Sequence, residues 1–228
     1  MKFLWILVFS TVITANVCAV NVKDLFNMLP NSAFGYYRLN GSLGSEYDLT
    51  TLLDPETTMI QNVKILKTVD VTNGYISLDF REIGMDYEVK TYYVEVAQFI
   101  GGSGKSYLAF KENTGIYNNF RVYRETNGAL ADVTDQVLNP GYRLAMTAML
   151  TNFGSSDKIK AFADAKRKDN GIVLDFQIPR YGTTIAVHIA GLTFAGTDPD
   201  VEEFTDSFVD LKWDRAKEHF VLGNLHGN

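Results

Sequence analysis

Apolar and polar residues alternate along much of the stretch 64–125, in the way that half-buried β-strands do. The segment 64–71 is followed by Asn73-Gly74, a dipeptide typical of a two-residue hairpin turn, and 75–80 is the expected return strand. Further runs of the same period follow before residue 126. The pattern therefore predicts an antiparallel meander.

The strand-like run 87–100 changes its alternation half-way along. Apolar residues occupy odd positions at Tyr87 and Val89, but even positions at Tyr92 and Val94. Either a β-bulge near Thr91 turns the later side chains to the other face, or both faces of this strand are partly covered.

Two segments show the three-to-four-residue spacing of apolar positions that amphipathic helices have. The first is 22–29, which follows Asn21, a good N-cap residue. The second follows Asn139-Pro140, a cap and first-turn pair, and runs to about residue 152. A short helix is also expected at 48–53.

The last part of the chain is again predicted to be strand-rich, with His226 in a tail expected to fray. The segment 156–168 is open between helix and strand, and 195–206 is expected to be an acidic loop or a short helix. The expected strands are 172–177, 183–192, 208–213 and 219–222.

These elements predict an α+β fold, mainly antiparallel β, in two related halves that each begin with a helix and continue as a meander. Residues 73–80 resemble residues 170–176. A tandem duplication is the interpretation we favour, and the alternative is that strands after Asn-Gly turns converge on similar sequences. The expected units are residues 20–138 and 139–228.

Residues 1–19 have the layout of a secretory signal peptide. Lys2 precedes a short apolar run, and small residues close the segment at Ala19. The run is shorter than the roughly 20 residues that span a bilayer; the alternative is a buried N-terminal strand. We therefore expect the leader to be removed and the mature chain to be exported to the periplasm, the cell surface or the exterior.

The single cysteine, Cys18, lies inside this leader, so the mature chain is expected to contain no thiol. No disulfide, thiolate metal site or cysteine nucleophile is then available. Lipidation of Cys18 is an alternative, although Asn16-Val17 fits poorly with the small residues that such a site prefers.

The formal net charge of −6 is spread along the chain. Nucleic-acid binding depends on neutralising phosphates with Lys and Arg, so a mildly acidic chain without a basic block disfavours nucleic acid as a partner. Aromatic residues make up 13% of the sequence, which favours a β-rich fold. We expect no cofactor, no metal ion and no transmembrane span in the mature chain.

Two short motifs resemble functional sequences, and we favour a structural interpretation of each. Residues 101–106 read Gly-Gly-Ser-Gly-Lys-Ser but lack the earlier glycine and the following helix of a phosphate-binding loop, so a flexible hairpin loop is expected. Residues 155–158 have a Ser-x-x-Lys spacing without its companion elements. His188 lies on the strand face opposite Ile185, Val187 and Ile189, and is expected to face solvent or to make a contact within the sheet.

Asp79 and Asp175 occupy equivalent places after the two Asn-Gly turns, and each faces away from its apolar neighbours. Such a pair of carboxylates could serve acid–base chemistry, but a strand Asp more often pairs with a Lys or Arg on a neighbouring strand. The turn 178–182 presents Arg180 and Tyr181, two residue types enriched at interaction hot spots. An ordinary hairpin connection is the alternative for this turn.

The sequence Pro179-Arg180-Tyr181-Gly182-Thr183-Thr184-Ile185, with Leu211-Lys212-Trp213-Asp214 later, resembles uncharacterised exported bacterial proteins. The resemblance covers about the last quarter of the chain and implies no activity, so no functional residue is carried over from it. The candidate ligand- or partner-binding residues are Arg180, Tyr181, Asp79, Asp175 and Trp213.

Export, the lack of a recognisable catalytic set and the Arg/Tyr-bearing turn together favour a non-enzymatic binding protein of the bacterial envelope or exterior. Its ligand would be a protein or a small molecule, and an inhibitor or accessory factor is the concrete form expected. Two alternatives stay open. One is a secreted hydrolase whose catalytic groups, such as Asp79, Asp175 or His188, meet only in space. The other is a structural component of the envelope.

Overall fold

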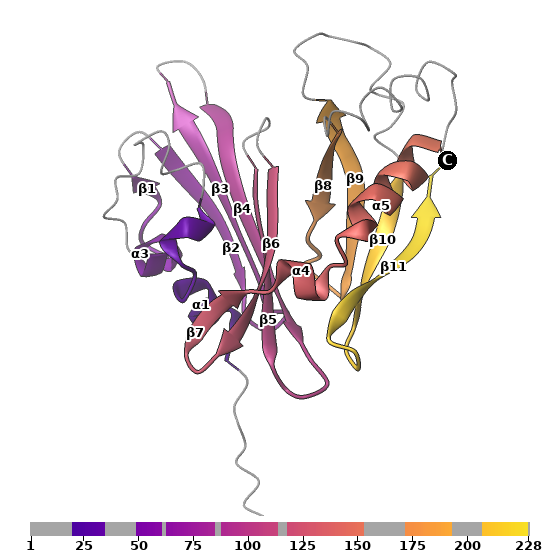
Figure 1. The fold of residues 1–228 in the computed structure, drawn as a ribbon. Helices are drawn as coiled ribbons and strands as arrows, with labels where there is room; N and C mark the ends of the chain where they lie inside the picture. Colours follow the sequence, from indigo (N-terminus) through magenta and orange to yellow (C-terminus); the bar gives the residue numbers. More distant parts are fainter. Residues whose placement is uncertain are drawn as a thin grey trace, which may run out of the picture.

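The computed structural model describes residues 20–34, 49–60, 63–84, 88–113, 118–152, 172–192 and 207–227. The predicted leader and the segments 156–168 and 195–206 lie outside these residues. Figure 1 shows two antiparallel sheets, with short helices against one face of the first sheet and a longer helix against the second.

The first sheet is the predicted meander, extended by a short strand at each edge. In the described part of the chain it has seven strands in sequence order. The hairpin at Asn73-Gly74 is confirmed, but residues 71–74 form a four-residue loop between the paired Asp70 and Tyr75 instead of a two-residue turn; Gly74 closes this loop with a positive φ of 65°. The strands are β1 (Met59–Ile60), β2 (Val63–Asp70), β3 (Tyr75–Ile83), β4 (Glu88–Ile100), β5 (Ser106–Asn113), β6 (Asn118–Thr126) and β7 (Ala129–Asp132).

A β-bulge in β4 explains the change of alternation that its sequence shows. Phe80 pairs with Tyr92 and Arg81 pairs with Lys90, so the register skips Thr91. The bulge turns the later apolar side chains of β4 to the face covered by helices, where Tyr92 is buried. The first of the two interpretations is therefore confirmed, and the second also holds, because Ala97 and Phe99 further along β4 are buried on the other face.

The second sheet is a meander of β8 (Ile172–Gln177), β9 (Thr184–Leu192), β10 (Phe208–Asp214) and β11 (His219–His226). These bounds agree closely with the prediction except at the end, where the prediction of a fraying tail was wrong. β11 continues to His226, whose ring stacks on Phe208 at 4.6 Å between centroids and whose Nε2 lies 3.0 Å from Asp210 Oδ2.

The first helix begins at a capping residue, whereas the 3-10 turn at Asn31–Ala33 and the helix at Thr134–Val137 have no side-chain cap. Asn21 caps the first helix as predicted, because its side chain accepts hydrogen bonds from the backbone N–H groups of Lys23 and Asp24. None of the described helices is long and apolar enough to cross a membrane. The helices are α1 (Val22–Asn27), a 3-10 turn η1 (Asn31–Ala33), α3 (Leu49–Leu53), α4 (Thr134–Val137) and α5 (Gly141–Asn152).

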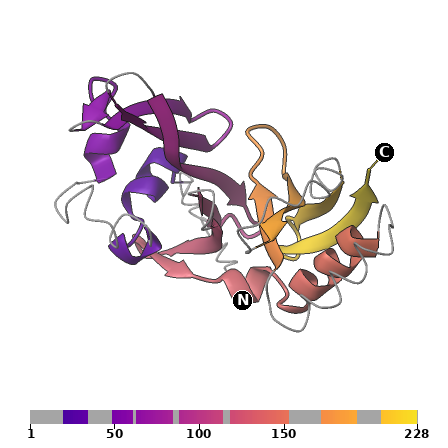
Figure 2. The ribbon, with the colours of Figure 1, turned by 90° about the horizontal axis from the view of Figure 1, so that it is seen from above.

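Both faces of the first sheet are buried. On one face, Leu78 and Phe110 pack with Leu25 and Phe26 of α1 and with residues of α3. The other face packs against the second sheet, and Met146 of α5 joins this second apolar cluster. Figure 2 shows α1 and α3 on the first sheet and α5 against the second. Residues 106–112 of β5 are buried throughout, because this strand serves both clusters.

The structure therefore has the predicted mainly antiparallel α+β class. Its two sheets differ in strand number within the described residues, and α4 and α5 connect them.

Candidate functional site

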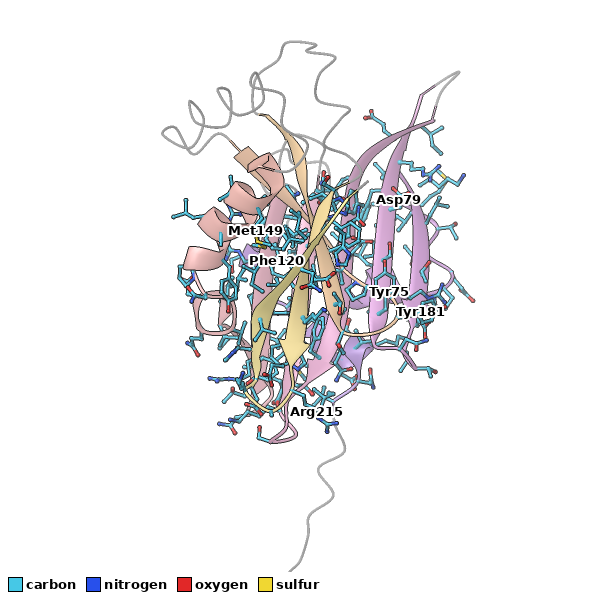
Figure 3. The ribbon with its side chains drawn as sticks, turned by 90° about the vertical axis from the view of Figure 1, so that its right-hand side faces the viewer. Tyr75, Asp79, Phe120, Met149, Tyr181 and Arg215 are labelled. Carbon is cyan, nitrogen blue, oxygen red and sulfur yellow. The ribbon has the colours of Figure 1, made fainter. Side chains whose placement is uncertain are left out.

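Four of the five candidate residues lie on or above the face of the first sheet that carries Tyr75. Asp79 shares this face because it follows Tyr75 at an even spacing on β3. Asp175 comes from β8 of the second sheet, and Arg180 and Tyr181 from the turn between β8 and β9. Figure 3 shows Tyr75, Asp79 and Tyr181 along the same side of the molecule.

The turn between β8 and β9 is tied to the first sheet by an ion pair. Arg180 Nε lies 2.9 Å from Asp70 Oδ2 at the end of β2, and the guanidinium lies 5.2 Å from the centre of the Tyr181 ring. Hydrogen bonds from Asn73 and from Arg180 hold the pKa of Asp70 below its usual value. The turn is therefore more than a hairpin connection, since it links two segments far apart in sequence.

Asp175 joins the two sheets through a buried lysine. The side chain of Lys111 on β5 is 2% exposed, and its Nζ lies 2.6 Å from Asp175 Oδ1. Glu95 Oε2 lies 3.7 Å from the same nitrogen, and Asn118 Nδ2 donates to Asp175 Oδ1 at 2.9 Å. Burial acts to lower the pKa of Lys111, but the Asp175 carboxylate outweighs it and the pKa is raised.

Each of the two candidate carboxylates has a basic partner, but neither partner lies on a neighbouring strand of the same sheet, as a cross-strand pair would require. Asp79 Oδ2 lies 3.0 Å from the guanidinium of Arg81 on the same strand. Asp175 also pairs in register with His188, so the topology does bring two residues of the hydrolase hypothesis onto neighbouring strands. Within the described residues, no group of three or more His, Cys, Asp or Glu side chains could hold a metal ion.

The fifth candidate, Trp213, lies in the core at 8% exposure. Its ring centroid lies 4.8 Å from that of Tyr107 and 5.6 Å from that of Phe99, both on the first sheet. Its Nε1–H donates to the backbone carbonyl of Ile100 at 3.2 Å. Trp213 therefore fixes the two sheets to each other instead of facing a ligand.

The Gly-Gly-Ser-Gly-Lys loop holds a carboxylate of the chain itself. Ser103 donates its backbone N–H, at 2.9 Å, and its hydroxyl to Glu218 Oε1, and Tyr107 Oη donates to Oε2 at 2.9 Å. These hydrogen bonds, led by those from Ser103, lower the pKa of Glu218 to about 2. A strand follows the loop, as expected, but the loop is bound to the β10–β11 hairpin. A Cβ on Gly101 would run into Glu218.

A polar hollow beside α4 is a feature that the sequence did not indicate. It has a volume of about 460 Å³ and is lined by residues 119–121 and 132–136. A smaller hollow of about 160 Å³ shares part of this lining and reaches Arg143 and Phe176. Because these residues come from β6, β7, α4, α5 and β8, no local motif marks the place.

Exposed large apolar residues flank both members of the Arg180–Asp70 pair along the chain. Val69 is 36% exposed, Val71 46% and Tyr181 66%. We call Val69, Asp70, Val71, Arg180 and Tyr181 the tip surface. Leu66, 38% exposed, lies further along β2; the other exposed large apolar residues among those described are Met59, Ile83 and Leu144.

The strand β2 also presents part of an open edge. It pairs with β1 only near its start, where Ile60 faces Val63 and Met59 faces Lys64. The Ile65 N–H donates to the Thr58 carbonyl at 2.9 Å, and beyond Ile65 the described part of the chain shows β2 pairing with β3 alone. An open edge has backbone N–H and C=O groups directed away from its own sheet.

Comparison with known proteins adds no candidate function: no family model, no curated protein and no solved structure matches this chain. Function is therefore inferred from the surfaces described above.

Proposed function

We propose that this protein is exported and binds another protein through the tip surface. The observation that carries the proposal is the Arg180–Asp70 ion pair, which brings the exposed Tyr181 to the end of β2, where Val69 and Val71 on either side of Asp70 are also exposed. Contiguous exposed apolar side chains mark interaction sites, and Tyr and Arg are the residue types that contribute most at such sites.

The open edge of β2 supports a protein partner over a small ligand. Val69 and Leu66 point to opposite faces of this strand, and both are exposed. An extended segment of a partner could pair with the edge and contact side chains on both faces, which is the usual form of β-strand addition. Export is supported by the leader-like layout of residues 1–19.

The hydrolase alternative has less support. A general acid or base at Asp79 or Asp175 would have to break the ion pair with Arg81 or Lys111 before acting. The envelope-component hypothesis and the tandem duplication stay predictions from the sequence.

The test is affinity capture from the native source with the mature protein and two single variants. Tyr181→Ala and Leu144→Ala each remove an exposed side chain, and the two side chains are 66% and 67% exposed. Leu144 lies on α5, away from the tip surface. We expect Tyr181→Ala to lose the captured partner and Leu144→Ala to retain it. Equal capture by both variants would contradict the proposal.

A further inference from the structure

The Lys111–Asp175 ion pair between the two sheets has a short N–O distance, and its lysine is almost completely buried. Lys111 Nζ lies 2.6 Å from Asp175 Oδ1, and the lysine side chain is 2% exposed. A second carboxylate, that of Glu95, lies 3.7 Å from the same nitrogen. An amine, an electrophilic carboxyl carbon and a proton acceptor are therefore held together by β5, β8 and β4.

We propose that Lys111 and Asp175 form an intramolecular isopeptide bond, an amide between Nζ and Cγ, which joins the two sheets covalently. The reaction is a condensation within the folded chain, with Glu95 as the group that moves a proton.

The chemistry balances without any other reactant. One proton passes from the Lys111 ammonium to the Asp175 carboxylate, and the free amine attacks Cγ. Glu95 accepts the second proton from the nitrogen and delivers it to the departing hydroxyl group, so that the C–O bond breaks and water leaves. One ammonium and one carboxylate become one neutral amide and one water molecule.

The surroundings favour this condensation in three ways. The fold already holds the amine and the carboxyl group together, so the reaction does not pay the entropy cost of bringing them into contact. Such positioning raises the rate of comparable reactions by several orders of magnitude. Asn118 Nδ2 donates to Asp175 Oδ1 at 2.9 Å, which holds the carboxyl group in place beside Lys111 Nζ. The product also removes a buried ion pair, and with it the cost of keeping two charges away from water.

The charged and titratable neighbours of Lys111 agree with the assigned roles. Tyr93 lies beneath the nitrogen, 4.9 Å from its ring centroid, and Glu95 and Asp175 supply the negative charge. The raised pKa of Lys111 favours its ammonium form, so a proton must leave the nitrogen before the amine can attack. Asp175, as the nearest base, is therefore the group that must accept the first proton.

Such a bond would be a covalent cross-link in a chain whose only cysteine is Cys18. It would close a long loop between β5 and β8. Cross-links of this kind stabilise the folded state largely by restricting the unfolded chain. For a protein expected to lack disulfides outside the cytosol, an amide would serve the same end and would resist reduction.

The test is mass spectrometry of the purified protein. We expect the intact mass to be one water molecule lower than the sequence mass of the purified chain, counted from the N-terminus found in the same spectra, and a protease digest to contain a branched peptide joining Lys111 to Asp175. The full sequence mass, with trypsin cleaving after Lys111, would overturn the proposal. So would a water loss that maps to a single linear peptide.

Two variants separate the chemistry from the fold. Glu95→Gln keeps the size and part of the hydrogen bonding of Glu95, and we expect a folded protein that retains the full mass. Asp79→Asn, on the same face of the sheet, is the matched control and should keep the water loss. A branched peptide of undiminished yield in folded Glu95→Gln would overturn the role given to Glu95.

Discussion

At the scale of single residues, several polar contacts that join parts of this molecule are made between residues far apart in the sequence. Arg180 and Asp70 are 110 residues apart, and Ser103 and Glu218 are 115 apart. The sequence marked Arg180, but it could not name the partner, because partners are set by how the sheets pack. Trp213 was also marked as a candidate binding residue, but its position on β10 places it on the buried face of the second sheet.

Glu218 provides a test of one such residue. Glu218→Ala removes the acceptor of three hydrogen bonds from Ser103 and Tyr107, and we expect a loss of about 1–3 kcal/mol in the free energy of unfolding. Urea unfolding would measure it, with the exposed Glu82→Ala as control. A loss no larger than that of the control would show that the loop does not depend on this carboxylate.

The pH dependence of Glu218 follows from the direction of its shift. Its pKa falls from a usual 4.5 to about 2 on folding, so its contribution to stability is complete above pH 4.5 and is lost as the pH falls towards 2. We expect the wild type to lose stability through that interval more steeply than Glu218→Ala. Parallel curves would contradict the assignment.

At the scale of elements, alternation predicted the strands well because half-buried strands carry a two-residue period. The same rule indicated either a bulge near Thr91 or a strand covered on both faces, and the register shows the bulge. The sequence did not indicate α4 or β1, because elements of four and two residues are too short to carry a period. It also ended the last strand too early, since the stacking of Phe208 on His226 is a contact between strands.

Trp213 of the β10–β11 hairpin contacts Phe99 and Tyr107 of the β4–β5 hairpin, and this aromatic contact between the two sheets can be tested by mutation. Trp213→Ala removes a ring that contacts Tyr107 and Phe99 on the first sheet, and we expect a loss of about 3–5 kcal/mol in unfolding free energy. Far-UV circular dichroism in urea would measure this loss, with Val71→Ala as an exposed control. A loss below 1 kcal/mol, at the level of surface substitutions, would mean that this ring does not join the sheets.

At the scale of the whole molecule, the two sheets are fixed to each other by one apolar cluster that contains residues of both predicted units. Phe120 of β6 and Phe176 of β8 stack within it at 4.3 Å between centroids. The tip surface depends on this arrangement, because Val69 and Tyr181 come from different sheets. The sequence predicted two units from their patterns but had no signal for the cluster between them.

The most direct measurement is urea unfolding of the mature chain, followed both by Trp213 fluorescence and by far-UV circular dichroism. The sequence has two tryptophans, and the other, Trp5, lies in the expected leader, so fluorescence reports the junction between the sheets while dichroism reports all strands. We predict one transition with the same midpoint for both probes. Loss of the fluorescence signal well before the strand signal would contradict a tip surface built from two fixed sheets.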